Sequence, residues 1–331
     1  MNKTPEIVAA IARKPPSWTA RMMACDIAEG LPSWAPARLQ TIFETLMPPQ
    51  TVALTARLVA HLSPELPFFF RGLLQVRKVS GLLRRLSLRL FFDDRHYLNS
   101  ALRKRIFYDE VEAALAQGAR QVVVLGAGFD VLCLQLASRH PQVLFIEVDQ
   151  QNTQALKRQA VMALCAGQPP AKLAFVAVDF RHQSLEEELQ TQLGNTWQVS
   201  LPSVAVVEGV WPYLDEAAIR ASLQSFRKIS AAGSTYLFTY FVLGGARWQQ
   251  KITAASTLVF ALVGEPVRYL PTDKRQIEAL LVEEGYAVDL SVSRTHGYVR
   301  YIVPAGFEDH VGPERILDSF VGVAVSQTGC G

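Results

Sequence analysis

The strongest constraint on the fold is an alternation of short apolar runs with helical segments, which starts near Arg120. Five of these runs are rich in β-branched or aromatic residues, and segments with helical spacing separate them. The runs are QVVVLG, VLFIEVD, LAFVAVD, SVAVVEG and TYLFTYF. Nearly continuous apolar strands are typical of a parallel sheet that helices cover on both faces. The sequence therefore predicts an α/β fold with a doubly wound parallel sheet.

Two further runs follow a predicted helix at 273–284. These runs are YAVDLSV and VRYIVPA. Both contain β-branched and aromatic residues. We expect them to close the sheet as an antiparallel hairpin.

The part of the chain before residue 115 has a different character. Its helical spacing is interrupted by prolines, and it contains few strand runs. We therefore predict two regions: an N-terminal helical cap at 1–115 that covers the substrate, and the sheet domain at 116–331.

Composition excludes several classes of protein. Half of the residues are hydrophobic and 19% are charged, against about 25% charged in average soluble chains, so we expect a deeply packed interior. The longest charge-free candidate for a membrane span, 252–264, has 13 residues, and a spanning helix needs about 20. The N-terminus lacks the apolar core of a signal peptide, which favours the cytoplasm. The four cysteines form no Cys-x-x-Cys pair, so we predict reduced thiols and no metal site.

Positive charge is concentrated in residues 71–105. This stretch carries ten Lys or Arg and two Asp, although the whole chain has a net charge of only +3. Its leucines and valines recur at steps of three and four, which predicts a basic amphipathic helix. Such a helix either packs its apolar face on the main domain or makes peripheral contact with a membrane or an acidic, acyl-bearing partner. We do not expect a nucleic-acid partner, because no recognised binding motif accompanies the charge.

The ends of the predicted strands carry the candidate ligand-binding residues, because open α/β sheets bind ligands beyond the carboxyl ends of their strands. Gly126 and Gly128 lie in the turn after the first strand, where a missing Cβ permits close approach to a ligand or simply a tight turn. The acid Asp149 ends the second strand, at a spacing from this turn that suits a ribose diol. Asp179 and Phe180 end the third strand, where a carboxylate and an aromatic ring suit an adenine.

The motifs LGAGFD and EGVWPYL together resemble the leucine carboxyl methyltransferase family of S-adenosylmethionine-dependent methyltransferases. This family includes bacterial enzymes that O-methylate polyketides and other small molecules. The resemblance runs from about residue 102 to residue 290, with fainter similarity at 19–24. It implies a Rossmann-like methyltransferase sheet and S-adenosylmethionine as the cofactor.

The resemblance also implies roles for individual residues. Arg103 matches the arginine that holds the methionine carboxylate, and Glu208 matches the glutamate that accepts from the methionine ammonium. The other cofactor-binding residues are Gly126, Gly128, Asp149, Asp179 and Phe180. The chain departs from the family pattern after LGAGFD, where relatives commonly carry an arginine and this sequence has Leu132 and Gln135.

Methyl transfer from a sulfonium depends mainly on alignment of the reactants. A general base helps only if the acceptor is a hydroxyl, since a carboxylate is already ionised. Tyr213 is the candidate catalytic residue, which would orient an acceptor oxygen, and the alternative is a packed aromatic. We interpret Trp211 as a pocket wall and Asp130 as either a helix cap or a ligand contact. Lys104 and Arg105 are interpreted as solvated charges, which could steer an acidic substrate.

The sequence thus predicts an O-methyltransferase that acts on a carboxylate of a small-molecule acceptor, with an acyl or polyketide acid as the favoured class. One alternative is hydroxyl methylation of a secondary metabolite, and another is a non-catalytic S-adenosylmethionine-binding adaptor. A nicotinamide-dependent oxidoreductase is disfavoured, because the turn lacks the third glycine of G-x-G-x-x-G and Glu208 has no role there. The oligomeric state cannot be read from these features.

Overall fold

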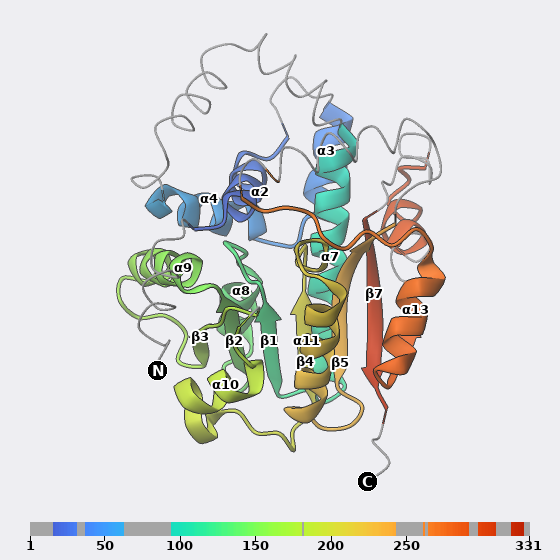
Figure 1. Cartoon of the computed structure of the whole chain (residues 1–331). Helices are drawn as coiled ribbons and strands as arrows, with labels where there is room; N and C mark the ends of the chain where they lie inside the picture. Colours follow the sequence, from blue (N-terminus) through green and yellow to red (C-terminus); the bar gives the residue numbers. More distant parts are fainter. Residues whose placement is uncertain are drawn as a thin grey trace.

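The computed structural model contains one seven-stranded mixed sheet with helices on both faces (Figure 1). The strand order is β3-β2-β1-β4-β5-β7-β6. The first five strands pair in parallel, and β7 pairs antiparallel with both β5 and β6. The structure describes residues 16–31, 37–62, 94–180, 182–242, 261, 264–290, 297–308 and 319–327.

The strands confirm the predicted doubly wound sheet. They are β1 (Gln121–Leu125), β2 (Leu144–Asp149), β3 (Leu173–Ala177), β4 (Ser203–Val207), β5 (Thr235–Phe241), β6 (Tyr286–Asp289) and β7 (Ser319–Ser326). Every residue of β1, β2 and β4 is buried. In β1, Val122 and Val124 enter one hydrophobic core while Val123 and Leu125 enter the other. This alternation follows from the two-residue period of a strand, and it explains why these strands are apolar on both faces.

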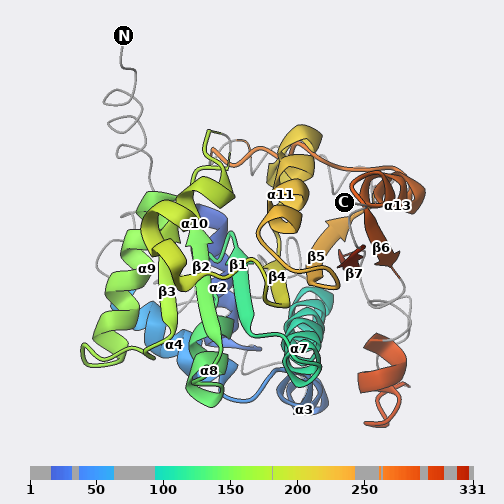
Figure 2. The ribbon, with the colours of Figure 1, turned by 90° about the horizontal axis from the view of Figure 1, so that it is seen from below.

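The helices form a layer on each face of the sheet (Figure 2). They are α2 (Trp18–Glu29), α3 (Ala37–Leu46), α4 (Thr51–Leu62), α7 (Asp94–Ala116), α8 (Leu132–Arg139), α9 (Gln151–Leu164), α10 (Leu185–Leu193), α11 (Glu216–Lys228) and α13 (Lys274–Glu283). The first core joins α7, α8 and α9 to the sheet, and the second joins α10, α11 and α13 to the opposite face.

Local capping signals define where several of these helices begin. The side chain of Asp215 accepts a hydrogen bond from the backbone N–H of Ala218 at 2.9 Å, which starts α11. In the same way Ser184 caps α10 and Asp273 caps α13. Such side chains satisfy backbone donors that have no partner within the helix.

The N-terminal helices pack on one another and on the layer that contains α8 and α9. The α2 helix packs against α4, α4 against α9, and α3 against α7. The α7 helix itself contacts β4, β5 and β7, so by packing it belongs to the helical layer of the sheet. The division of the chain at 1–115 and 116–331 stays a prediction.

The expected C-terminal hairpin is wrong in one of its two strands. The run YAVDLSV does supply β6, but VRYIVPA forms a π-helical turn, η5 (Tyr298–Ile302). The partner of β6 is β7 instead. The turn is held by α7, because the hydroxyl of Tyr301 donates to Asp109 at 2.8 Å and Arg300 pairs with Glu110 at 3.1 Å. These tertiary contacts outweigh the strand propensity of the run.

The sequence analysis predicted a basic amphipathic helix at 71–105 and no membrane-spanning helix. Most of the basic stretch falls on residues 71–93, which lie outside the described residues. Among the helices that the structure describes, none combines the length and the apolar character needed to cross a bilayer.

Candidate cofactor site

The turn after β1 needs glycine at two positions. Gly126 and Gly128 have φ angles of +68° and +48°, in the left-handed region that side chains disfavour. A Cβ on Gly126 would lie 2.4 Å from Cγ2 of Val210, and a Cβ on Gly128 would lie 2.9 Å from Cβ of Ala20. The turn is therefore packed between the segment after β4 and the start of α2.

Asp149 at the end of β2 is joined directly to this turn. The backbone N–H of Gly128 donates to Oδ2 of Asp149 at 2.6 Å, and the N–H of Gln150 donates to Oδ1 at 2.7 Å. Burial raises the pKa of Asp149, although these two donors and Lys157 oppose the shift. The structure thus brings the predicted ribose acid and the predicted glycine turn together.

Arg103, on α7, reaches the end of β4. Its Nε lies 2.8 Å from Oε1 of Glu208, while Nζ of Lys104 lies 2.9 Å from Oε2 of the same carboxylate. Lys104 also forms an ion pair with Asp130, which follows the glycine turn. The sequence placed Arg103 and Glu208 in one site, and the structure brings them into contact.

The interpretation of Lys104 as a solvated charge is wrong, because its side chain is only 13% exposed. Burial opposes its charge, but Asp130 and Glu208 outweigh burial and raise the pKa of Lys104. Asp130 also accepts a hydrogen bond at its Oδ1 from the N–H of Leu132, the first residue of α8, at 2.5 Å, although the N-cap residue of that helix is Val131. Arg105 points elsewhere and pairs with Asp109 at 2.9 Å. Arg103 and Lys104 thus both contact Glu208 whereas Arg105 does not, and the sequence alone did not show which of these three consecutive cations enter the site.

Tyr213, the predicted catalytic residue, lies in the short helix η3 (Trp211–Tyr213) after β4. Its side chain is half-buried and hydrogen-bonds with Thr19 of α2, and burial raises the pKa of Tyr213 to about 12. Thr19 in turn donates its backbone N–H to Oε2 of Glu265 at 3.1 Å, and its hydroxyl donates to the same oxygen. Sequence reasoning missed both Thr19 and Glu265; the faint family similarity at 19–24 was the available signal for Thr19.

The other predicted residues occupy the expected strand ends, with one exception. Asp179 is buried and Phe180 half-buried just after β3, beyond the point where the N–H of Val178 donates to the carbonyl of Asp149 at 2.9 Å. The interpretation of Trp211 as a pocket wall is wrong. It is completely buried and its ring stacks on Phe238 with 4.3 Å between centroids.

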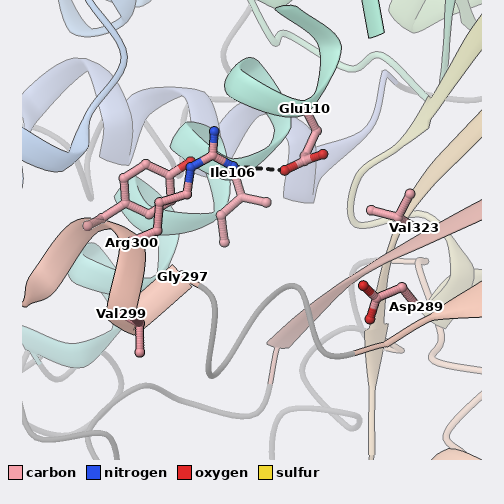
Figure 3. A pocket seen from close by; sticks show the side chains of 8 residues that line it. Ile106, Glu110, Asp289, Gly297, Val299, Arg300 and Val323 are labelled. Carbon is pink, nitrogen blue, oxygen red and sulfur yellow. Dashed lines mark hydrogen bonds and ion pairs between the residues drawn. The ribbon is translucent and has the colours of Figure 1, made fainter. Parts of the chain in front are cut away.

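A pocket of about 430 Å³ lies outside this site, between α7, η5 and the β6–β7 edge (Figure 3). Ile106, Val299 and Val323 contribute apolar wall, and the Arg300–Glu110 ion pair crosses one side. None of the predicted site residues lines it.

In the described part of the chain, no group of three or more His, Cys, Asp or Glu side chains is placed to hold a metal ion.

Fold and site together define a Rossmann-like protein whose glycine turn, acids and cations meet at the carboxyl ends of β1, β2 and β4. Residues 93–227 match the model of the leucine carboxyl methyltransferase family. This match confirms the family resemblance that the sequence motifs predicted.

Curated relatives cover the same part of the chain. A protein of Mycolicibacterium gilvum, named "Putative S-adenosyl-L-methionine-dependent methyltransferase", is 34% identical over 144 residues, which are 44% of this chain and 45% of the relative. A protein of a Parafrankia species with the same description is 32% identical over 40% of this chain and 41% of its own length. The chain thus spans less than half the length of these relatives. Their descriptions agree with the predicted cofactor.

Solved structures with the same fold include a DUF574 family protein of Streptomyces avermitilis. It has a TM-score of 0.55 at 14% identity, and the match covers 96% of this chain and 99% of that one. A Thermobifida fusca protein assigned as a methyltransferase has a TM-score of 0.51 at 15% identity, with 90% and 100% covered. At these identities the likeness concerns the fold, and it confirms the predicted α/β architecture.

Proposed function

We propose that this protein is an S-adenosylmethionine-dependent O-methyltransferase that acts on a carboxylate of a small, acyl or polyketide-type acid. The observation that carries the proposal is the Arg103–Glu208 ion pair beside the glycine turn. Lys104 bridges Glu208 to Asp130, and the N–H of Asp130 donates to the carbonyl of Ala127 in that turn at 3.0 Å. A paired cation and anion thus adjoin a nucleoside-type turn.

The residues at this edge suit both ends of the cofactor. Arg103 and Glu208 offer a cation and an anion with charged atoms 2.8 Å apart, which is the complement of an amino-acid zwitterion. Arg103 and Glu208 are already partly buried as a pair. When an amino-acid zwitterion binds, its carboxylate can pair with Arg103 and its ammonium with Glu208, so that neither buried charge is left without a partner. Asp149 and the adjacent Gly128 suit a ribose diol. When bound, S-adenosylmethionine supplies an electrophilic methyl group on its sulfonium.

The state of Tyr213 supports a carboxylate as the acceptor. Burial raises the pKa of Tyr213 to about 12, further above neutral pH than the ordinary value of about 10 at which a phenol is already protonated. A neutral phenol donates a hydrogen bond to an acceptor oxygen and does not remove a proton from it. A carboxylate needs orientation alone, whereas a hydroxyl acceptor would benefit from a base.

The cofactor assignment is tested by calorimetric titration with S-adenosylhomocysteine, beside NADH, for the wild type and for Asp149→Ala. We expect binding of S-adenosylhomocysteine alone, and its loss in the variant. The matched control is Asp273→Ala, which removes a carboxylate at the start of α13, outside the site. Failure of the wild type to bind S-adenosylhomocysteine would overturn the proposed function.

The acceptor class is tested by methyl transfer to medium-chain acids and to neutral alcohols of the same chain length. We expect transfer to the acids. Tyr213→Phe should lower kcat and leave the affinity for S-adenosylhomocysteine unchanged, because the phenol orients the acceptor. Transfer to the alcohols alone would replace the carboxyl assignment with hydroxyl methylation.

Two further proposals concern where the protein acts. We propose a cytoplasmic enzyme whose basic stretch 71–105 makes peripheral contact with anionic membranes, on the strength of the charge that remains when the paired residues Arg103, Lys104 and Arg105 are left out. Co-sedimentation with anionic and with neutral vesicles tests the contact. Binding to neither kind of vesicle would leave the apolar face of this stretch to pack on the protein itself.

A further inference from the structure

A buried ion pair lies next to the glycine turn and has no part in the site described so far. Lys157 of α9 places its Nζ 2.6 Å from Oε2 of Glu147, and the two side chains are 1% and 2% exposed. The pair is deeper than the Arg103–Glu208 pair, whose side chains are 14% and 12% exposed. Sequence reasoning missed both residues.

Stability alone does not account for such a pair. Transfer of two charges from water into the core carries a desolvation penalty that can exceed their mutual attraction. Well-packed hydrophobic residues therefore often replace a buried ion pair without loss of stability. Burial raises the pKa of Glu147 to about 7, although Lys157 opposes the shift. The surrounding core thus disfavours the charged pair, and a role beyond packing is expected.

The position of Lys157 indicates that role. Its Nζ lies 3.4 Å from the carbonyl oxygen of Ala127, the residue between the two glycines of the turn. Glu147 and Asp149 are two residues apart on β2, so their side chains leave the same face of the strand. Lys157 therefore lies among the turn, Glu147 and the predicted ribose acid.

The charge of Lys157 also reaches the acids that flank the turn. It lowers the pKa of Asp149 and that of Asp130, while burial acts in the opposite direction on both. Glu265 raises the pKa of Asp149, and the backbone donors Gly128 and Gln150 lower it. An ionised Asp149 accepts hydrogen bonds from both hydroxyls of a diol, whereas a protonated one has lost part of this capacity.

We propose that Lys157 is a positioning residue for the cofactor, which holds the Ala127 carbonyl of the glycine turn and places a cation beside Asp149. Glu147 is its counter-ion and prevents an unpaired charge in the core. This inference rests on the proposed function, because its test uses S-adenosylhomocysteine as the ligand.

The test compares the variant Glu147→Gln with the double variant Lys157→Met/Glu147→Gln. Glu147→Gln leaves Lys157 with an amide acceptor in place of its counter-ion, so we expect this variant to be less stable than the wild type while it keeps the charge of Lys157 beside Ala127. The double variant removes both charges and so leaves none unpaired in the core. Lys172→Met is the matched control, because this lysine is on the surface, away from the turn, and donates to the carbonyl of Gln142 at 2.9 Å. Thermal unfolding verifies that each variant is folded.

We expect Glu147→Gln and Lys172→Met to bind S-adenosylhomocysteine within about threefold of the wild type. The double variant should bind it about tenfold or more weakly than Glu147→Gln, which is the effect of one lost hydrogen bond to a charged group. The ratio of the two dissociation constants should grow as the pH falls, because loss of Lys157 raises the pKa of Asp149, so that Asp149 takes up its proton at a higher pH in the double variant.

A purely structural pair predicts a different result. The folded double variant would then bind S-adenosylhomocysteine as well as Glu147→Gln does, or with a deficit that does not change with pH, and either result overturns the inference. Failure of the proposed function is distinguishable, because in that case the wild type itself does not bind the ligand.

Discussion

Substitution of Gly126 by alanine tests why the turn after β1 carries glycine. The φ of +68° adds a backbone cost of about 1–2 kcal/mol for an L-residue in the left-handed region. The new Cβ would also lie 2.4 Å from Cγ2 of Val210, and such overpacking typically costs about 1–3 kcal/mol. The free energy of unfolding should therefore fall by about 2–5 kcal/mol for Gly126→Ala.

Two further variants separate the two contributions. Gly306 has the same φ of +68°, and a Cβ added there would meet nothing within 4 Å, so Gly306→Ala should cost only the backbone part, about 1–2 kcal/mol. Adding Val210→Ala to Gly126→Ala removes the clashing methyl group and leaves an ordinary contact of 3.5 Å. In a double-mutant cycle the two substitutions should then be coupled favourably by about 1 kcal/mol or more.

Urea unfolding of the ligand-free variants measures these differences, provided that the slope of each transition is unchanged. The reasoning is refuted if Gly126→Ala costs no more than Gly306→Ala. It is also refuted if Val210→Ala and Gly126→Ala are simply additive, because the close contact would then not contribute.

Three other predictions concern the buried polar groups. Burial raises the pKa of Glu147 from 4.5 to about 7, so folding favours the protonated form of this side chain. As the pH rises from 4.5 to 7, the free energy of unfolding of the wild type should therefore fall relative to that of Glu147→Gln, by at most about 3 kcal/mol. Urea titrations near pH 4.5 and pH 8 check the sign, and a constant difference would contradict it. Gln135→Ala removes an amide that donates to the carbonyl of Pro49 and accepts from the hydroxyl of Thr51 at 3.2 Å, and should cost about 1–3 kcal/mol in the same assay. Thr19→Val should lower the free energy of unfolding by about 1–2 kcal/mol, because the variant lacks the hydroxyl that contacts Glu265 and Tyr213. Thr19→Ser keeps a hydroxyl and should be nearly as stable as the wild type. Equal stability of the two Thr19 variants would exclude a role for the hydroxyl.

Local patterns in the sequence were sufficient for the sheet and for part of the site. The apolar runs that became β1 to β5 are recognisable because each strand is covered on both faces, so burial leaves a continuous signal. The contact between Gly128 and Asp149 was also predictable, since Gly128 follows β1, Asp149 ends the adjacent parallel strand β2, and both therefore reach the same edge of the sheet.

The same patterns failed where strand propensity met a specific tertiary contact. VRYIVPA has the composition of a strand, but its aromatic and basic side chains bind α7, and the chain turns there as η5. The true partner of β6, at 319–326, was not recognised, because pairing between strands depends on register and not on composition.

The class of fold, the glycine turn and the acids at the ends of β2 and β4 are readable from the amino-acid sequence, because these features depend on residues close together in the chain. The contacts of Lys104 with Asp130 and Glu208, of Thr19 with Glu265, and of Lys157 with Glu147 arise only when the chain is folded. The first two contacts join residues that lie 26 to 246 positions apart. Whether a charged side chain meets water or a buried partner depends on which elements pack around it, and no local pattern carries that information.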